Sequence, residues 1–163
     1  MQLLAATFFT DTYKVTGNVL SEVPRLSDCL NDPRVGFLRI ENAGWQDLSG
    51  VQPPALCAEP MIMRKDAIRI AIPQHALDPL RPRSPTDRYA ATVALDMFVV
   101  RGAIHRRPSD PANLTPFFMQ QTRLFVPVAD GVFHCVLNDS FDGSADVLLL
   151  GAAHARYWFA KPA

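Results

Sequence analysis

Basic side chains are the residues of this sequence whose type and spacing could bind a charged partner. Arg64, Lys65 and Arg69 lie close together in the chain, and Arg81 and Arg83 follow in a proline-rich segment. Such a cluster could contact the phosphates of a nucleic acid. The opposing interpretation is a solvated strand rim and linker, because 16 acidic residues balance the 16 basic ones. Proteins that hold nucleic acid mainly through its phosphates usually carry a basic excess, so nucleic-acid binding is the alternative hypothesis.

Catalytic and metal-binding arrangements are not recognisable in this sequence. The four histidines are scattered and have no metal-ligand spacing: His75, His105, His134 and His154. Residues 138–146 place oxygen-bearing side chains at alternate positions, as a calcium loop does, but Leu149 stands where such a loop needs a glutamate. A polar turn between two strands explains the segment more simply. We therefore predict no catalytic residue, no metal site and no cofactor.

Composition is typical of a soluble globular protein, with 48% apolar and 20% charged residues. The three cysteines have no paired spacing, which favours reduced thiols over disulfides. No apolar run approaches the roughly 20 residues that a membrane helix needs. The apolar start is not interpreted as a signal peptide, because its Ala-Ala-Thr at 5–7 returns in mid-chain at 90–92. We expect a cytoplasmic protein with no membrane partner.

Three blocks of similar residues occur twice along the chain in the same order. They are 3–20 over 88–105, 37–42 over 125–130 and 61–72 over 148–159, at shifts of 85, 88 and 87 positions. In the first block, Asp11 falls on Asp96 and Gly17 falls on Gly102. Small insertions between matched blocks are tolerated in connecting segments. The pattern indicates a tandem duplication.

Alternation of apolar and polar residues predicts a half-buried strand in residues 13–20 and again in 98–105. Gly17 and Gly102 occupy the same place in these two strands. A glycine inside a strand costs stability, so its recurrence predicts a sharp bend or a close approach of another backbone.

A short helix is expected in each copy. In residues 24–31, Leu26, Cys29 and Leu30 recur at helical spacing, and the Asp-Pro at 32–33 should end the helix. In the second copy, Thr115 can cap a turn that Pro116 opens.

The remaining strands are expected to be short. Residues 37–41 and 124–129 should each form one strand that ends in a polar turn. The third block predicts a hairpin in each copy, with its turn at 64–66 in the first copy and near Gly151 in the second.

These elements predict a first unit at 1–73, a linker at 74–87 and a second unit at 88–163. Proline and arginine dominate the linker, which is typical of a stiff, extended connector. A unit of about 70 residues has a marginal core when alone. We therefore expect the two units to pack together with pseudo-twofold symmetry.

A family resemblance rests on two of these segments. Residues 61–73, in which apolar residues lead to Arg64-Lys65-Asp66 and an isoleucine-rich strand follows, resemble the second signature of Sm-like proteins. Residues 13–20 resemble the Val-x-Gly-x-Leu core of their first signature. Lys65 departs from the turn glycine of that family. Both copies are also similar to short bacterial domains of unknown function. The resemblance implies a small β-barrel in each copy.

The fold class expected from the sequence is mainly β, with two tandem Sm/SH3-like barrel units that each contain one short helix. The function expected is a non-enzymatic interaction or assembly module whose strand edges bind a protein partner or a second copy. The alternative is an Sm-like protein that binds RNA or another nucleic acid. Its contacts would be Arg64, Lys65, Arg69, Arg81 and Arg83.

Overall fold

The computed structural model of the protein describes residues 1–74, 87–106 and 123–162. Within these ranges the chain is mainly β-structure, and every strand pair is antiparallel. The expected mainly β class is therefore confirmed. The same ranges contain one α-helix, and none of their helices has the length and apolar character needed to cross a membrane.

Six strands and the helix make up the first half of the chain. They are β1 (Gln2–Phe9), β2 (Tyr13–Ser21), α1 (Leu26–Asn31), β3 (Phe37–Asp47), β4 (Ala55–Leu56), β5 (Met61–Arg64) and β6 (Ile70–Pro73). A 3-10 turn at Lys65–Ala67 joins β5 to β6. The predicted helix is confirmed, and it buries Leu26 and Leu30 against the sheet of this half.

Five described strands make up the second half. They are β7 (Asp87–Leu95), β8 (Phe98–Arg106), β9 (Phe125–Cys135), β10 (Gly143–Gly151) and β11 (Ala155–Pro162). Two 3-10 turns, at Asp139–Phe141 and Ala152–His154, precede β10 and β11.

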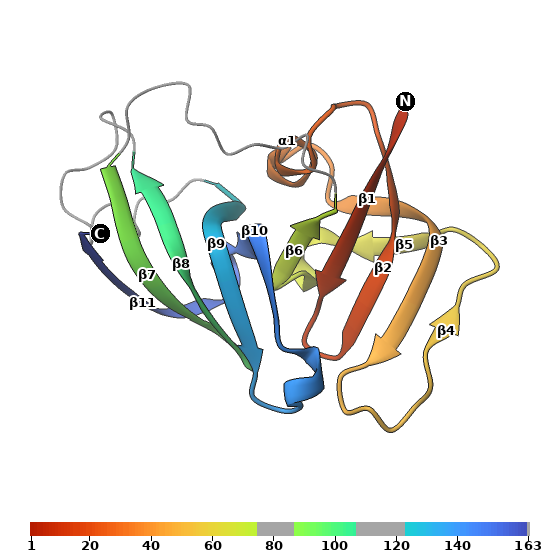
Figure 1. Ribbon diagram of the computed structural model, residues 1–163. Coiled ribbons are helices and arrows are strands. Elements are labelled where there is room, and N and C mark those ends of the chain that lie inside the picture. The colour runs from red at the N-terminus through yellow and green to blue at the C-terminus, as the bar shows by residue number, and fades with distance from the viewer. Residues whose placement is uncertain (75–86, 107–122, 163) are drawn as a thin grey trace.

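The two halves arrange their strands in the same order (Figure 1). In the first half β6, β1, β2 and β3 lie side by side, and β4 and β5 both pair with β3. In the second half the order is β11, β7, β8, β9 and β10. Residues 13–20 and 98–105 therefore occupy equivalent places in the second strand of each half. Likewise, β4 and β5 together occupy the place beside β3 that β10 occupies beside β9.

The two matched glycines mark places where the next strand passes very close. A Cβ added to Gly17 would lie 2.5 Å from Cγ2 of Ile40, and one added to Gly102 would lie 2.4 Å from Cγ1 of Val128. The pairing register shifts beside each glycine. The expected close approach of another backbone is confirmed, since the carbonyl of Glu41 would lie 3.0 Å from the first of these Cβ atoms.

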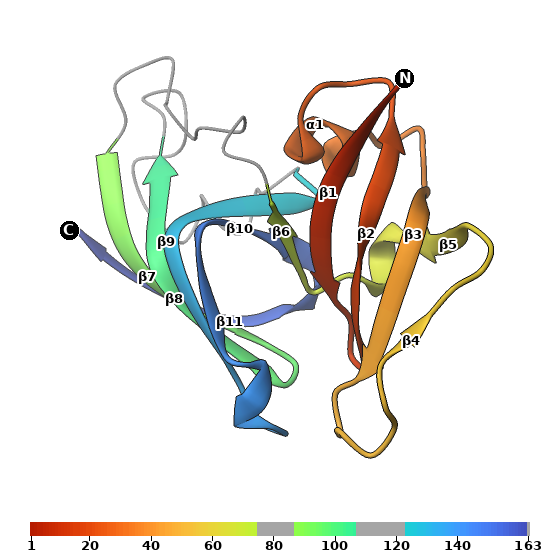
Figure 2. The same ribbon diagram turned by 45° about the vertical axis from the view of Figure 1, so that its right-hand side comes forward.

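Each half also bends at a left-handed residue in its third strand. Asn42 in β3 has a φ of 51° and Asp130 in β9 has a φ of 49°. Asparagine and aspartate tolerate this conformation better than other non-glycine residues. The polar turns predicted at the ends of short strands are therefore wrong. They are bulges inside two 11-residue strands, which curve around each half (Figure 2).

The hairpins predicted in the third block are also wrong. β5 pairs with β3, whereas β6 pairs with β1 and β10, so the two strands are not partners of each other. β10 and β11 are likewise unpaired with each other, and β11 lies against β7. A 3-10 turn between the strands redirects the chain from one side of the half to the other. The predicted helix after Thr115 and most of the linker at 74–87 lie outside the described residues.

Side chains of both halves are shared between two buried clusters. Phe9, from the first half, packs edge-on against Phe98 and Phe133, with ring centroids 5.5 Å and 5.0 Å apart. In return, Phe125 and Leu149 of the second half lie in the cluster of the first half. Burying one large apolar side chain stabilises a fold by about 1.5–3 kcal/mol. Each half therefore depends on the other for part of its core.

Candidate interaction edges

A strand joint connects the two halves into one sheet. β6 pairs with β10, with Ala71 opposite Leu149 and Ile70 opposite Leu150 (Figure 1). β6 is the outer strand beside β1, whereas β10 is the outer strand beside β9. The joint therefore unites edges that differ in their place within each half. A twofold relation would repeat this contact as a second joint between β11 and β5. No such pairing occurs among the described strands, so the strand pairing does not show the expected pseudo-twofold symmetry.

The backbones come closest at the end of this joint. The N–H of Gly151 donates to the carbonyl of Arg69 at 2.9 Å. A Cβ on Gly151 would lie 2.4 Å from the carbonyl oxygen of Ile68, so only glycine fits there without a shift of the backbone.

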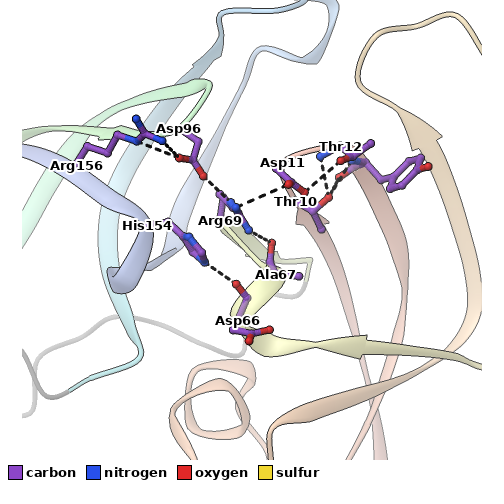
Figure 3. A network of polar contacts seen from close by, with 10 residues as sticks. Thr10, Asp11, Thr12, Asp66, Ala67, Arg69, Asp96, His154 and Arg156 are labelled. Carbon is purple, nitrogen blue, oxygen red and sulfur yellow. Dashed lines mark hydrogen bonds and ion pairs between the residues drawn. The ribbon is translucent and has the colours of Figure 1, made fainter.

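Charged side chains bridge the halves beside the joint (Figure 3). Nε of Arg69 donates to Asp96 at 2.9 Å, and Nη2 of Arg156 donates to the other oxygen of Asp96, also at 2.9 Å. Nη1 of Arg69 donates to the carbonyl of Ala67 at 2.7 Å. Asp11 approaches Arg69 at 4.0 Å from the opposite side. Asp96 thus accepts one arginine from each half.

Electrostatics favour the ionised form of Asp96. Burial by itself raises the pKa of this carboxyl, but hydrogen bonds from Arg69 and Arg156 outweigh that effect and leave the pKa below its ordinary value. Asp96 also has a φ of 48° in the turn between β7 and β8, a conformation that aspartate tolerates.

A further polar contact crosses between the halves at the two 3-10 turns. Nε2 of His154 lies 2.5 Å from the carbonyl oxygen of Asp66 (Figure 3). Because that oxygen can only accept, the contact requires a proton on Nε2. Asp66 also pairs with Arg64 through its side chain.

The basic residues predicted to contact nucleic acid have different surroundings. Arg64 is exposed and pairs with Asp66 at 2.5 Å. Lys65 is buried, and its Nζ donates to the carbonyls of Cys29 and Asp32 at 2.6 Å and 3.0 Å, where α1 ends. Burial lowers the pKa of Lys65 below its ordinary value of 10.5.

The remaining predicted contacts do not join them in one surface. Arg69 is mostly buried in the bridge to Asp96. Arg81 and Arg83 lie outside the described residues. Of the candidates that the structure describes, Arg64 is the one whose guanidinium faces solvent, whereas Lys65 and Arg69 are bonded within the fold.

Two edges of the sheet have no second partner strand within the described residues. β5 pairs with β3 alone, and β11 pairs with β7 alone. Near the β5 edge, large apolar side chains are exposed on β3, β4 and β5: Phe37, Leu56 and Ile62. An unpaired edge with exposed apolar residues is a template for pairing with another chain.

A hollow of about 350 Å3 lies between the halves next to the joint. Its walls are mainly apolar. Val35 and Phe37 come from the first half of the chain and Leu124 from the second, and Arg64 and His154 also line the hollow. The exposed apolar area thus extends from the β5 edge towards the joint.

The other sequence candidates are bonded within the second half. In the loop at 138–146, Asn138 caps a 3-10 turn by accepting from the N–H of Ser140. Asp142 accepts from the N–H of Cys135 at 2.8 Å and contacts Nδ1 of His134 at 2.7 Å. Within the described part of the chain, no three or more His, Cys, Asp and Glu side chains gather as metal ligands would.

Sequence reasoning did not single out Asp96 and Arg156 as partners. A signal was present, however, since Asp96 matches Asp11 and Arg156 matches Arg69 in the repeated blocks. Charged residues of the same sign thus stand at matched places in the two halves, but their partners depend on how the halves meet.

Comparison with protein-family models, with curated proteins and with solved structures finds no match to this chain.

Proposed function

We propose that this chain is a non-enzymatic assembly module, formed by tandem duplication of an Sm-like β unit, that associates through its unpaired strand edges. The observation that carries the proposal is the joint between β6 and β10, which joins two unlike edges. It leaves the complementary edges, β5 and β11, without a second partner strand among the described residues. Strand addition at such edges supplies main-chain hydrogen bonds together with side-chain pockets.

The duplication is supported by correspondences at single positions. Gly17 and Gly102 meet equivalent atoms of the neighbouring strand, and Asn42 and Asp130 have the same left-handed backbone at the same place. The strand order is also the same in both halves. Independent origins would not require such agreement in the places where the strands bend.

The surface near β5 also supports association. Ile62 is 62% exposed on this short strand, and Phe37 is 54% exposed on the adjoining β3. Natural proteins usually protect an open edge with charged side chains, proline or a covering element. Apolar side chains beside an open edge instead favour burial against another strand.

The experiment measures the mass of the protein in solution by size-exclusion chromatography with light scattering. We expect the unmodified protein to form species larger than one chain and Ile62→Lys to shift it to the monomer. Val136→Lys is the matched control, because Val136 is similarly exposed at 64% but follows β9, an interior strand of the sheet. A protein that stays monomeric at all concentrations and binds no protein partner would contradict the proposal.

Nucleic-acid binding remains the alternative prediction. Lys65 and Arg69 already donate to groups of the fold, so an RNA phosphate would compete with those bonds. The ratio of absorbance at 260 nm to that at 280 nm, recorded on the same column, reports any bound nucleic acid. Retention of nucleic acid that Arg64→Ala releases would favour the alternative.

A further inference from the structure

The joint between β6 and β10 leaves two sheet edges of the same two kinds without such a joint. β6 and β11 occupy equivalent places in the two halves, and so do β10 and the strand formed by β4 and β5. Inside the chain, β6, the edge strand beside β1, pairs with β10, the edge strand beside β9. The chain therefore has one copy of each edge left over, β11 at one end of the sheet and β5 at the other.

We infer that the partner at these edges is a second copy of this chain, docked head to tail so that β11 of one copy pairs with β5 of the next. This inference rests on the proposed assembly function and specifies its partner. The same kind of joint would then recur at every contact. Such a contact is heterologous, so it repeats from copy to copy until a ring closes or continues as a filament.

The internal joint also specifies the register between copies. Leu149 lies opposite Ala71, and Leu150 lies opposite Ile70. At the shift of 87 positions that relates the third blocks, Ile62 takes the place of Leu149, and residue 158 takes the place of Ala71. Ile62 of one copy should therefore lie opposite residue 158 of the other. This position buries a side chain that is 62% exposed in the single chain.

Charge complementarity identifies the contact that should orient the two copies. Inside the chain, Arg69 of the first half reaches Asp96 of the second half, and their side chains are 13% and 20% exposed. The matched residues are Arg156 and Asp11, and they belong to the edges that are left over. Their side chains are 68% and 59% exposed, so each keeps free surface for a further partner, although Arg156 already binds Asp96 and Asp11 lies 4.0 Å from Arg69. Arg156 of one copy should therefore bind Asp11 of the next.

One position makes the joint between copies weaker than the internal one. Arg64 stands where the internal joint has Gly151, whose place leaves no room for a Cβ. The strands of two copies must separate slightly at that end, which favours reversible assembly. Arg64→Gly should accordingly strengthen self-association.

The test combines two variants that block different ends. Asp11→Arg alters the end that contains β5, and Arg156→Ala alters the end that contains β11. Both residues also contact the charged bridge beside the internal joint, where Asp11 lies 4.0 Å from Arg69 and Arg156 binds Asp96. Each variant alone should associate at least tenfold more weakly than the unmodified protein in analytical ultracentrifugation. When they are mixed, the intact Asp11 of one and the intact Arg156 of the other should form a 1:1 dimer with the affinity of the unmodified joint.

The mixture also controls for folding, because an unfolded variant could not restore the contact. A mixture that associates no more tightly than its components would overturn the head-to-tail joint, as would single variants that assemble like the unmodified protein. If Ile62→Lys still shifts the protein to the monomer in that case, the proposed assembly function stands. Only the pairing of β11 with β5 is then wrong. An unmodified protein that remains monomeric and binds no protein partner would overturn both.

Discussion

The side-chain amide of Asn31 pairs with the backbone of Phe125, 94 residues further along the chain. Its Oδ1 accepts from the N–H of Phe125 at 2.9 Å, and its Nδ2 donates to the carbonyl of the same residue at 3.2 Å. The amide thus takes the place of a neighbouring strand at the start of β9. Nδ2 also donates to the carbonyl of Ser27 at 3.0 Å, inside α1. Through this one side chain, the helix of the first half holds a strand of the second.

Asn31→Ala should lower the free energy of unfolding by about 1–3 kcal/mol, because it leaves a backbone donor and acceptor without partners in a partly buried site. Asn31→Asp retains an acceptor for the N–H of Phe125 but places a carboxylate oxygen against the carbonyls of Phe125 and Ser27, so its loss at neutral pH should be at least as large. Urea unfolding followed by circular dichroism measures both. Equal stability of Asn31→Ala and the unmodified protein would show that water replaces the amide at no cost.

Gly17→Ala and Gly102→Ala should each destabilise the fold by about 1–3 kcal/mol, since the added methyl overpacks against the next strand. Gly36→Ala is the control, because an added Cβ there meets nothing within 4 Å. It should be neutral or slightly stabilising through the lower entropy of the unfolded chain. Denaturant midpoints at equal m-values provide the comparison. Similar midpoints for all three variants would mean that the strands separate easily at the two bends.

Lys65→Met should lower stability by about 1–3 kcal/mol, because the carbonyls of Cys29 and Asp32 lose their donor while the apolar stem is kept. Arg64→Met, in an exposed ion pair, is the control and should have little effect. Unfolding in urea at neutral pH measures the difference.

The loss caused by Lys65→Met should also depend on pH. Burial lowers the pKa of Lys65 below 10.5, so between the lowered value and 10.5 the unfolded chain binds more protons than the folded one. The stability that Lys65 contributes therefore rises with pH across that window. The difference in unfolding free energy between the unmodified protein and Lys65→Met should be measured at several pH values up to 10.5. A difference that falls as pH rises would contradict the lowered pKa of Lys65.

Asp96→Asn should weaken the bridge between the halves while it preserves the left-handed turn, since asparagine also tolerates a positive φ. The pKa of Asp96 is lowered in the folded state, so its contribution to stability is present above the ordinary value of 3.8 and is lost as pH falls through the folded value. The variant should be less stable at neutral pH, and the difference should shrink in acid.

Asp130→Asn is the matched control for this variant. Asp130 also has a positive φ, but its pair with Arg88 is exposed on both sides, so little change is expected. Acid unfolding curves of the two variants make the comparison. A pH-independent loss in Asp96→Asn would show that its hydrogen bonds, and not its charge, hold the halves together.

Local patterns in the sequence were sufficient to predict two of the strands and the helix. The period-two alternation in residues 13–20 and 98–105 predicted two strands, and the spacing of Leu26 and Leu30 predicted the helix. The recurring glycines predicted a close approach, because the conformational cost of glycine inside a strand is local while the space it frees is needed by a neighbour.

The partners of those elements were decided only by the tertiary structure. β5 and β6 look like a hairpin because they are adjacent in sequence, yet each pairs with a strand far away in the chain. Lys65 and Arg69 look like surface charges, but the end of α1 and the second half bury them.

By itself, the sequence determined the strands at 13–20 and 98–105, the helix that follows the first of them and which residues recur, since these follow from local periodicity and backbone freedom. The tertiary structure decided that unlike edges meet between the halves and that Arg69 binds Asp96. Long-range strand pairing is selected by the total burial and hydrogen bonding of the assembled sheet, and no single segment carries that information.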